Sequence, residues 1–339
     1  MVWITSYLKI IFMTSFDHKT LCIHIGSYKT GSSYFQNMCF ENRELLESKG
    51  VIYPKIAVHY KASIGHAHRK LLRNDNLQKL LTKISNSKAP KKFLISWEGL
   101  SHPKYFKFLE SDIFSSQQNL TVKIVFVCRS YVDFMSSLYK QFSQSRQLND
   151  DFITYLNKEN QPHNWGKIID KWSNLVGPEN IKLLNYDNIK YDLSANILQA
   201  FDIDTKLTAP KGRIDNLSQS SVTMKVCRML VDKGVNKQQI SHIASHLQKI
   251  DTKHPEFQNL TEFTSSDIQA IKTKFDHEMS SIQNTIPLDF PVEDLLISKT
   301  QNYNAETLHA STQTAIRELL GIDHEEIHSV KTQLESLIR

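Results

Sequence analysis

The sequence predicts an α/β protein in which helices cover both faces of a parallel sheet, followed by a helical C-terminal region. Up to about residue 210, short apolar runs alternate with longer stretches of helical periodicity. Beyond that point the strand-like runs fade and polar helical segments such as SHIASHLQKI take over. We therefore expect an N-terminal extension over 1–19, an α/β domain over 20–210 and a helical region over 211–339.

Five apolar runs are the expected strands of the sheet. The strongest is VKIVFVC, which is β-branched and aromatic as a strand buried on both faces should be. The expected strands are Leu21–Gly26, Val51–Tyr53, Phe93–Ser96, Val122–Cys128 and Ile181–Tyr186.

Two helices are expected directly after the first and fourth strands. Residues 32–49 carry apolar side chains at helical spacing and end at Gly50, where a left-handed cap is favoured. Residues 131–144 form the other expected helix, with Ser130 as N-cap and Asp133 three residues later as a variant of the capping box.

The composition indicates which kinds of ligand and which cellular compartment to expect. The 339 residues are 40% hydrophobic and 22% charged, which allows a sizeable core. The formal charge of +6 comes from dispersed Lys and Arg, which favours an anionic ligand and argues against nucleic-acid binding. Only four cysteines occur, without a Cys-x-x-Cys pair, so we expect neither a disulfide framework nor a cysteine-rich metal site, and a reduced cytoplasmic location.

The first thirteen residues, MVWITSYLKIIFM, are apolar but too short for a membrane span of about 20 residues, and Lys9 interrupts them. We expect no transmembrane segment. Because Met13 precedes the first strand closely, residues 1–12 are either an upstream-start artefact or a loose flap.

The loop GSYKTGSS, residues 26–33, joins the first strand directly to a helix. Backbone amides and the positive end of the helix dipole at such a junction suit a phosphate group. It is not a Walker loop, because Lys29 precedes Gly31, whereas that motif places Lys after the second Gly. The alternative is an ordinary turn with a solvent-facing Lys.

These residues carry a resemblance to a known family. HIGSYKTGSS resembles the 5′-phosphosulfate loop of sulfotransferases that use 3′-phosphoadenosine-5′-phosphosulfate (PAPS), particularly the bacterial and carbohydrate-type branch. That family also has a strand ending in Arg with a Ser eight positions later, which together hold the 3′-phosphate. Arg129 and Ser137 stand at this spacing. The resemblance implies a P-loop-like sulfotransferase fold.

The resemblance covers about residues 20–222. It extends to the segments Tyr53-Pro54, Ser96-Trp97-Glu98, Trp172…Gly177…Tyr186 and Asn216, Ser218, Ser220. The tail beyond is unmatched. The G-x-x-G-x-x-K loop of the cytosolic small-molecule branch is absent from the sequence, which weakens an assignment to small aromatic acceptors.

The resemblance also implies roles for the loop residues. Lys29 would neutralise charge on the bridging and sulfuryl oxygens, and Thr30, Gly31, Ser32 and Ser33 would bind the 5′-phosphate. No metal is required for this chemistry. The alternative for Lys29 is a simple phosphate counter-ion.

Glu98 follows an apolar strand and is the candidate general base, provided that desolvation brings its pKa toward the working pH. Its alternative role is to cap a helix or to orient a loop through Ser96. For Arg129 the alternative is a structural ion pair.

Other polar and aromatic residues have plainer explanations. His66-Ala67-His68, near Arg69, Lys70 and Arg73, would suit an acidic or sugar acceptor, but a solvated helix face is favoured, and a zinc site there lacks further ligands. The side chains of Trp97, Trp165 and Trp172 are expected to fill the core.

We therefore expect a PAPS-dependent sulfotransferase that acts on an acceptor hydroxyl or amine, with a carbohydrate or glycolipid preferred on resemblance alone. The alternatives are a nucleotide kinase and a catalytically inactive nucleotide- or glycan-binding module. The kinase is disfavoured because the loop is not a Walker loop and the Arg129 strand end offers no acid for Mg²⁺. Lys29 and Glu98 argue against the inactive module.

Overall fold

The computed structural model describes residues 18–54, 68, 75–86, 92–108, 114, 119–144, 152–159, 161–209, 220–260, 263–296 and 305–338. The chain divides into two compact units. Unit 1 comprises Met1–Phe134, Asn157–Gly212 and Thr273–Ile297, and unit 2 comprises Met135–Leu156, Arg213–Lys272 and Ser298–Arg339. The domain boundary expected near residue 210 stays a prediction.

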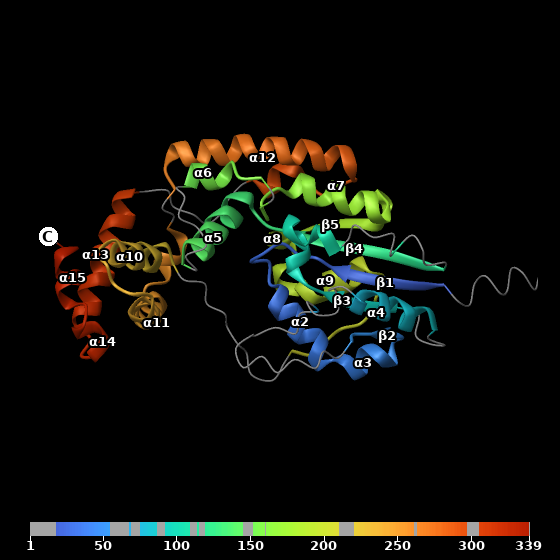
Figure 1. Ribbon diagram of the computed structural model, residues 1–339, viewed down its shortest axis with the longest axis horizontal. Coiled ribbons are helices and arrows are strands. Elements are labelled where there is room, and N and C mark those ends of the chain that lie inside the picture. Colours follow the sequence, from blue (N-terminus) through green and yellow to red (C-terminus); the bar gives the residue numbers. More distant parts are fainter. Residues whose placement is uncertain are drawn as a thin grey trace, which may run out of the picture. The chain divides into compact units, whose positions relative to one another are not determined.

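Unit 1 contains the predicted parallel sheet, and the expected fold class is confirmed. Its strands are β1 (Lys19–His24), β2 (Val51–Ile52), β3 (Lys92–Ser96), β4 (Leu120–Cys128) and β5 (Ile181–Asn185). All of them pair in parallel in the order β2-β3-β1-β4-β5 (Figure 1). Each predicted strand is present, with ends that differ by at most two residues.

The strand order places the centre of the sheet at a topological switch. The chain leaves β1 toward β2 on one side, whereas β4 lies on the other side of β1 and leads on to β5. In open α/β sheets, ligands bind beyond the carboxyl ends of the strands at such a point. The residues that follow β1 and β4 are therefore the first candidates for a site.

Alternate residues of β4 support the helical layers on the two faces of the sheet. Val125 and Val127 belong to a buried cluster with side chains of the helices α2 (Ser32–Glu41), α3 (Arg43–Ser48) and α9 (Leu193–Ala200). Phe126 points the other way and meets Trp165 of the helix α7 (Trp165–Val176), with ring centroids 6.0 Å apart. Trp97, Trp165 and Trp172 are buried, as predicted.

The helices of unit 1 are α2 (Ser32–Glu41), α3 (Arg43–Ser48), α4 (Asp75–Asn86), α7 (Trp165–Val176), α8 (Tyr186–Ile189) and α9 (Leu193–Ala200). Its 3₁₀ helices are η1 (Glu98–Ser101), η2 (Pro103–Phe108), η3 (Pro178–Asn180), η4 (Lys190–Asp192) and η6 (Val292–Leu295). Helices α5 (Tyr131–Gln144) and α12 (Ser265–Thr285) have residues in both units.

The single helix predicted over residues 32–49 is wrong in one respect, because it is interrupted at Asn42. The Asn42 side chain donates to the Met38 carbonyl at 2.8 Å and to the Thr208 carbonyl at 2.9 Å. Its Oδ1 also accepts from the Thr208 amide at 3.0 Å. These bonds anchor the residue at the break. Gly50 has a φ of 75°, in agreement with the predicted left-handed cap.

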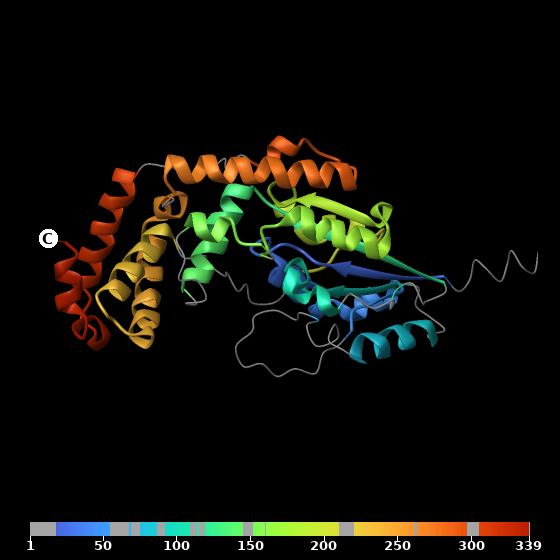
Figure 2. The ribbon, with the colours of Figure 1, turned by 45° about the horizontal axis from the view of Figure 1, so that its top comes forward.

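Unit 2 contains helices alone within the described residues, and the helical C-terminal part of the expected fold class is confirmed. Its elements are α6 (Phe152–Leu156), α10 (Ser221–Asp232), α11 (Lys237–Lys253), η5 (Pro255–Asn259), α13 (Ala305–Leu320), α14 (Glu325–His328) and α15 (Lys331–Ser336). Helices α10 and α11 lie beside α13, α14 and α15 (Figure 2). One apolar cluster joins them, with Leu230, Leu247, Ile316 and Leu334 fully buried.

The N-terminus of α10 is closed by polar groups of unit 2. Ser220 is the N-cap, and its Oγ accepts from the Thr223 amide at 3.0 Å. The buried Asp251 carboxylate accepts from the Ser220 amide at 3.0 Å, from Ser220 Oγ at 2.6 Å and from Thr223 Oγ1 at 3.0 Å. Ser220 therefore has a structural role.

Across the described ranges, every helix is too short or too polar to traverse a lipid bilayer.

Candidate anion-binding site at the carboxyl end of the sheet

The loop between β1 and α2 has an unusual backbone conformation, with two residues at positive φ. Lys29 and Gly31 both have left-handed conformations, with φ of 65° and 74°. The Thr30 hydroxyl donates to the Ser27 carbonyl at 2.7 Å, and the Ser27 amide donates to the Val127 carbonyl at 2.9 Å. These bonds hold the loop against the end of β4.

Gly31 is required by space as well as by conformation. A Cβ on Gly31 would lie 2.5 Å from Cδ2 of Leu193. Gly31 is also the N-cap of α2, so it supplies no side chain to the first turn of that helix. The first-turn amides and the positive end of the dipole are therefore left to an anion.

Ser32, the first residue of α2, presents a buried hydroxyl at this helix end. Its Oγ has no hydrogen-bond partner within the described part of the chain. A buried hydroxyl without a partner costs free energy, so its presence calls for a ligand or water. Ser33 is half-buried, and the Thr30 hydroxyl is engaged within the loop.

Arg129 follows β4 and reaches the same loop. Its Nη1 donates to the Lys29 carbonyl at 3.4 Å, and its Nη2 lies 3.7 Å from the Asp133 carboxylate. Its buried Nε has no partner among the residues described. The ion pair proposed as an alternative is present, and it leaves one donor of the guanidinium fork unused.

Lys29 and Arg129 place two positive charges at the ends of adjacent strands. Burial of the Lys29 ammonium group and, next, the positive charge of Arg129 lower the pKa of Lys29. Two cations that repel each other would both be stabilised by an anion between them. The arrangement is electrostatically complementary to a phosphate or sulfate ester.

Ser130 is the N-cap of α5, as predicted, and accepts from the Asp133 amide at 3.4 Å. The capping-box variant takes a different form, since the Ser130 amide donates to Asp187 of α8 at 3.1 Å. Asn185 in turn accepts from the Asp187 amide at 3.0 Å, and its buried Nδ2 is unpartnered in the part of the chain described.

Glu98 lies at the start of η1 and is linked to β1 through hydrogen bonds. Gln36 Nε2 donates to Glu98 at 2.9 Å and to Ser96 Oγ at 3.1 Å. Ser96 Oγ is in turn 2.8 Å from Nδ1 of His24. The chain of contacts gives the half-buried Glu98 carboxylate a fixed orientation.

His24 ends β1 beneath the loop and is fully buried. Burial lowers the pKa of His24 to about 3, so the ring is neutral at physiological pH. Its Nε2 is unpartnered in the described structure, and a Cβ on Gly26 would lie 2.6 Å from this atom and 2.8 Å from Ser32 Oγ. His24 and Ser32 thus place two polar atoms next to the space that the missing side chain of Gly26 leaves open.

Sequence reasoning missed His24, Gln36, Asn185 and Asp187. A signal existed for His24 and Asn185, because each is a polar residue that ends an apolar strand of a parallel sheet. Gln36 sits between the buried Phe35 and Cys39 on α2, where a polar residue on an apolar face is unusual.

The remaining predicted residues are placed as follows. Ser137 is half-buried on α5 and belongs to unit 2, so its role beside Arg129 stays a prediction. His68 is fully buried, donates its amide to the Ser96 carbonyl at 2.8 Å and accepts from the Ser96 amide at 3.0 Å. The solvated helix face is therefore wrong for His68. Outside the described residues lie His66, Ala67, Arg69, Lys70, Arg73, Asn216 and Ser218.

No protein-family model and no curated protein sequence matches the chain. The structure is similar to a solved sulfotransferase from Alicyclobacillus acidocaldarius, with 12% identity and a TM-score of 0.35 over 62% of this chain and 91% of that one. It is also similar to retinol dehydratase in complex with androsterone and inactive cofactor PAP, with 13% identity and a TM-score of 0.32 over 80% and 82% of the two chains.

A third similar structure is retinol dehydratase in a complex with retinol and PAP, with 15% identity and a TM-score of 0.29 over 92% of this chain and 85% of that one. The likeness to these solved structures is at most 15% in sequence identity and 0.35 in TM-score. At such low identities and TM-scores it carries no argument about the reaction, which has to rest on the geometry of the site.

Proposed function

We propose that the chain is a sulfotransferase that moves a sulfuryl group from PAPS to an acceptor hydroxyl or amine. The observation that carries this proposal is the pairing of Lys29 and Arg129. They stand at the carboxyl ends of adjacent central strands, at the open N-terminus of α2, and Nη1 of Arg129 donates to the Lys29 carbonyl at 3.4 Å.

The residues at the start of α2 suit the 5′-phosphate of the donor. The left-handed Gly31 leaves the first-turn amides open, and the buried hydroxyl of Ser32 supplies a further donor. Charge-assisted hydrogen bonds from amides and hydroxyls to phosphate are stronger than bonds between neutral groups. Ser33 and the Thr30 amide complete the proposed set.

Arg129 is the proposed partner of the 3′-phosphate, with Ser137 as a second donor. The fork of Arg129 is oriented by the Asp133 carboxylate and by the Lys29 carbonyl, so little side-chain entropy would be lost on binding. The unpartnered Nε of Arg129 supports an additional acceptor at this position.

Lys29 is the proposed catalytic cation. Sulfuryl transfer resembles phosphoryl transfer, in which positioning and neutralisation of charge on the leaving oxygen account for most of the rate. The left-handed backbone of Lys29 directs its side chain from a fixed point on the loop. The lowered pKa of Lys29 makes proton donation to the leaving oxygen easier than for an ordinary lysine.

Glu98 is the proposed general base for the acceptor. Its orientation by Gln36 supports a fixed position for the carboxylate, which proton abstraction requires. The same contact also serves the alternative, in which Glu98 orients the β3 end. The acceptor is proposed only as a hydroxyl or amine, since no described residue supports the sugar acceptor expected from the sequence.

Donor identity is testable without a known acceptor. Adenosine 3′,5′-bisphosphate (PAP) should bind much more tightly than ADP in calorimetry, and EDTA should not weaken it. Arg129→Ala should remove most of the preference, because a charge-assisted pair contributes about 1.5–3 kcal/mol. Arg129→Lys should retain part of it, since the charge remains and the fork is lost.

Arg317→Ala provides the matched control, because it removes an exposed arginine of α13 in unit 2 and should leave both affinities unchanged. The proposal fails if wild-type protein binds ADP as tightly as PAP, or if binding depends on Mg²⁺. In that case the kinase hypothesis becomes the better account.

A further inference from the structure

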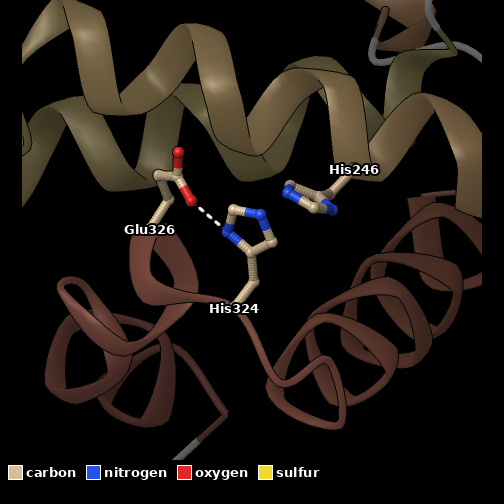
Figure 3. A group of neighbouring side chains, drawn as sticks. All are labelled: His246, His324 and Glu326. Atoms are coloured by element: carbon tan, nitrogen blue, oxygen red, sulfur yellow. Dashed lines mark ion pairs between the residues drawn. The ribbon is translucent and has the colours of Figure 1, made fainter.

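A group of metal-ligating side chains lies in unit 2 and plays no part in the proposed reaction. It consists of His246, His324 and Glu326, whose ligand atoms all lie within 4.8 Å of one another (Figure 3). The three side chains converge from two helical segments that are about 80 residues apart in sequence.

The apolar core of unit 2 fixes the two segments that carry these side chains. His246 lies on α11, whose Ile243 and Leu247 are fully buried, and Glu326 precedes the buried Ile327 in α14. His324 is the N-cap residue of α14. The polar side chains therefore lie beside a packed helix contact, so their backbones are held in place before any ligand binds.

The three side chains of the group contact one another. Nδ1 of His324 makes an ion-pair contact with Oε2 of Glu326 (Figure 3). The rings of His246 and His324 meet edge to face, with centroids 4.8 Å apart.

A second histidine of α11 supports the carboxylate from outside the group. His242 stands one helical turn before His246, and its Nδ1 lies 2.8 Å from Oε1 of Glu326. Metal-ligating carboxylates are commonly held by such outer hydrogen bonds, which orient the ligand. His242 and His246 also have the i, i+4 spacing that brings two side chains to one helix face.

We propose that His246, His324 and Glu326 bind a divalent ion of the zinc class, with His242 as the positioning residue for Glu326. Two imidazole nitrogens and one carboxylate oxygen form a known zinc ligand set, which leaves a fourth position for water. Ligand atoms at about 2.0–2.1 Å from a tetrahedral ion are about 3.3 Å apart. Side-chain rotations suffice to bring the ligand atoms, which now lie within 4.8 Å of one another, to that separation.

The competing explanation is a surface network of ion pairs without metal. That network would account for the contact between His324 and Glu326, whereas His246 meets it through an edge-to-face ring contact with His324.

The site would link α11 to the start of α14 within one unit. Its ligands all belong to unit 2, so the proposal does not depend on sulfuryl transfer and can be tested without activity. An ion that binds only the folded chain also stabilises it, by an amount set by its concentration relative to the dissociation constant.

The test is calorimetric titration of Zn²⁺ into the full chain, purified without a polyhistidine tag and freed of metal with EDTA, which is then removed. Wild-type protein should bind one Zn²⁺ with an affinity that each of His246→Ala, His324→Ala and Glu326→Gln lowers at least about 10²-fold. His242→Ala should lower it about 10- to 100-fold, as expected for an outer-shell partner. Mg²⁺, which prefers oxygen ligands, should give no comparable binding.

His309→Ala is the matched control, since His309 is exposed on α13 of the same unit and its loss should leave zinc affinity unchanged. A second readout is the unfolding midpoint, which Zn²⁺ should raise for wild type and not for Glu326→Gln. If His246→Ala does not fold, His246→Gln replaces it. The proposal is overturned if wild type binds no Zn²⁺, or if the ligand variants bind it as tightly as wild type.

Discussion

The N-termini of α2 and α10 are built from similar residues and are completed in opposite ways. At α10 the Ser220 hydroxyl caps the helix, and the buried Asp251 carboxylate accepts three hydrogen bonds there. At α2 a glycine occupies the cap position, and the buried hydroxyl of Ser32 has no partner in the described structure.

A helix N-terminus attracts an anion, and the two ends differ in where that anion comes from. Unit 2 supplies its own carboxylate to α10, so this end contributes to stability. The corresponding position at α2 has two cations nearby, and no carboxylate from the described residues caps it. The N-terminus of α2 is therefore the end suited to a ligand. Substitutions of single residues at each helix end test this difference.

The largest effect is expected at the closed end. Asp251→Ala should lower the free energy of unfolding by about 3 kcal/mol, because it leaves buried donors of Ser220 and Thr223 without an acceptor. Chemical denaturation of the full chain measures this loss of stability. Asp232→Ala, at the exposed C-terminal end of α10, should change the free energy of unfolding by less than about 0.5 kcal/mol. A similar loss in both variants would mean that the network adds nothing.

Lys29→Ala should lower turnover at least about 10²-fold, which corresponds to about 2.7 kcal/mol, while the protein stays folded. The readout is PAP release from PAPS with any acceptor that supports turnover. Lys29→Gly removes the same ammonium group but suits the left-handed backbone better, so it should be as inactive and more stable than the Ala variant. Retained turnover in either folded variant would refute the catalytic role of Lys29.

His24 predicts a pH dependence of stability. Its pKa is about 3 in the folded protein and about 6.5 in the unfolded chain, so acid favours the unfolded state, which binds the proton. This contribution is fully present above about pH 6.5 and should fall by about 2 kcal/mol between pH 7 and pH 5. His24→Asn, which retains a polar group toward Ser96, should show a shallower decline in denaturation series over this range. Parallel curves for the two proteins would show that His24 does not titrate on unfolding.

The smallest effect separates binding from stability at the open end. Ser32→Ala should weaken PAP binding by about 1 kcal/mol. It should leave the free energy of unfolding unchanged or slightly higher, because the removed hydroxyl makes no hydrogen bond to any described residue. Ser220→Ala should do the reverse, lowering stability by about 1 kcal/mol without affecting PAP. Equal losses of stability would erase the distinction between the two helix ends.

Much of the fold could be predicted because strands buried on both faces leave continuous apolar runs, as VKIVFVC shows. The break at Asn42 could not, because it involves bonds to Thr208, far away in the sequence. For the site, the motif spacing indicated Lys29 and Arg129. The bonds that connect Glu98 to His24 run through Gln36 and Ser96, and such a chain depends on the register between β1 and β3, which local sequence does not specify.

The order of strands has a consequence for how the protein is made. β1 is the central strand of the sheet and the first to leave the ribosome, yet its neighbours β3 and β4 are synthesised about 70 and 100 residues later. At roughly 5–20 residues per second, the apolar β1 waits some 5–20 seconds for β4. The contact between Arg129 and Lys29 joins residues 100 positions apart. The candidate site therefore forms late in synthesis, and a nascent chain stalled before β4 would expose the central strand of the sheet to chaperones.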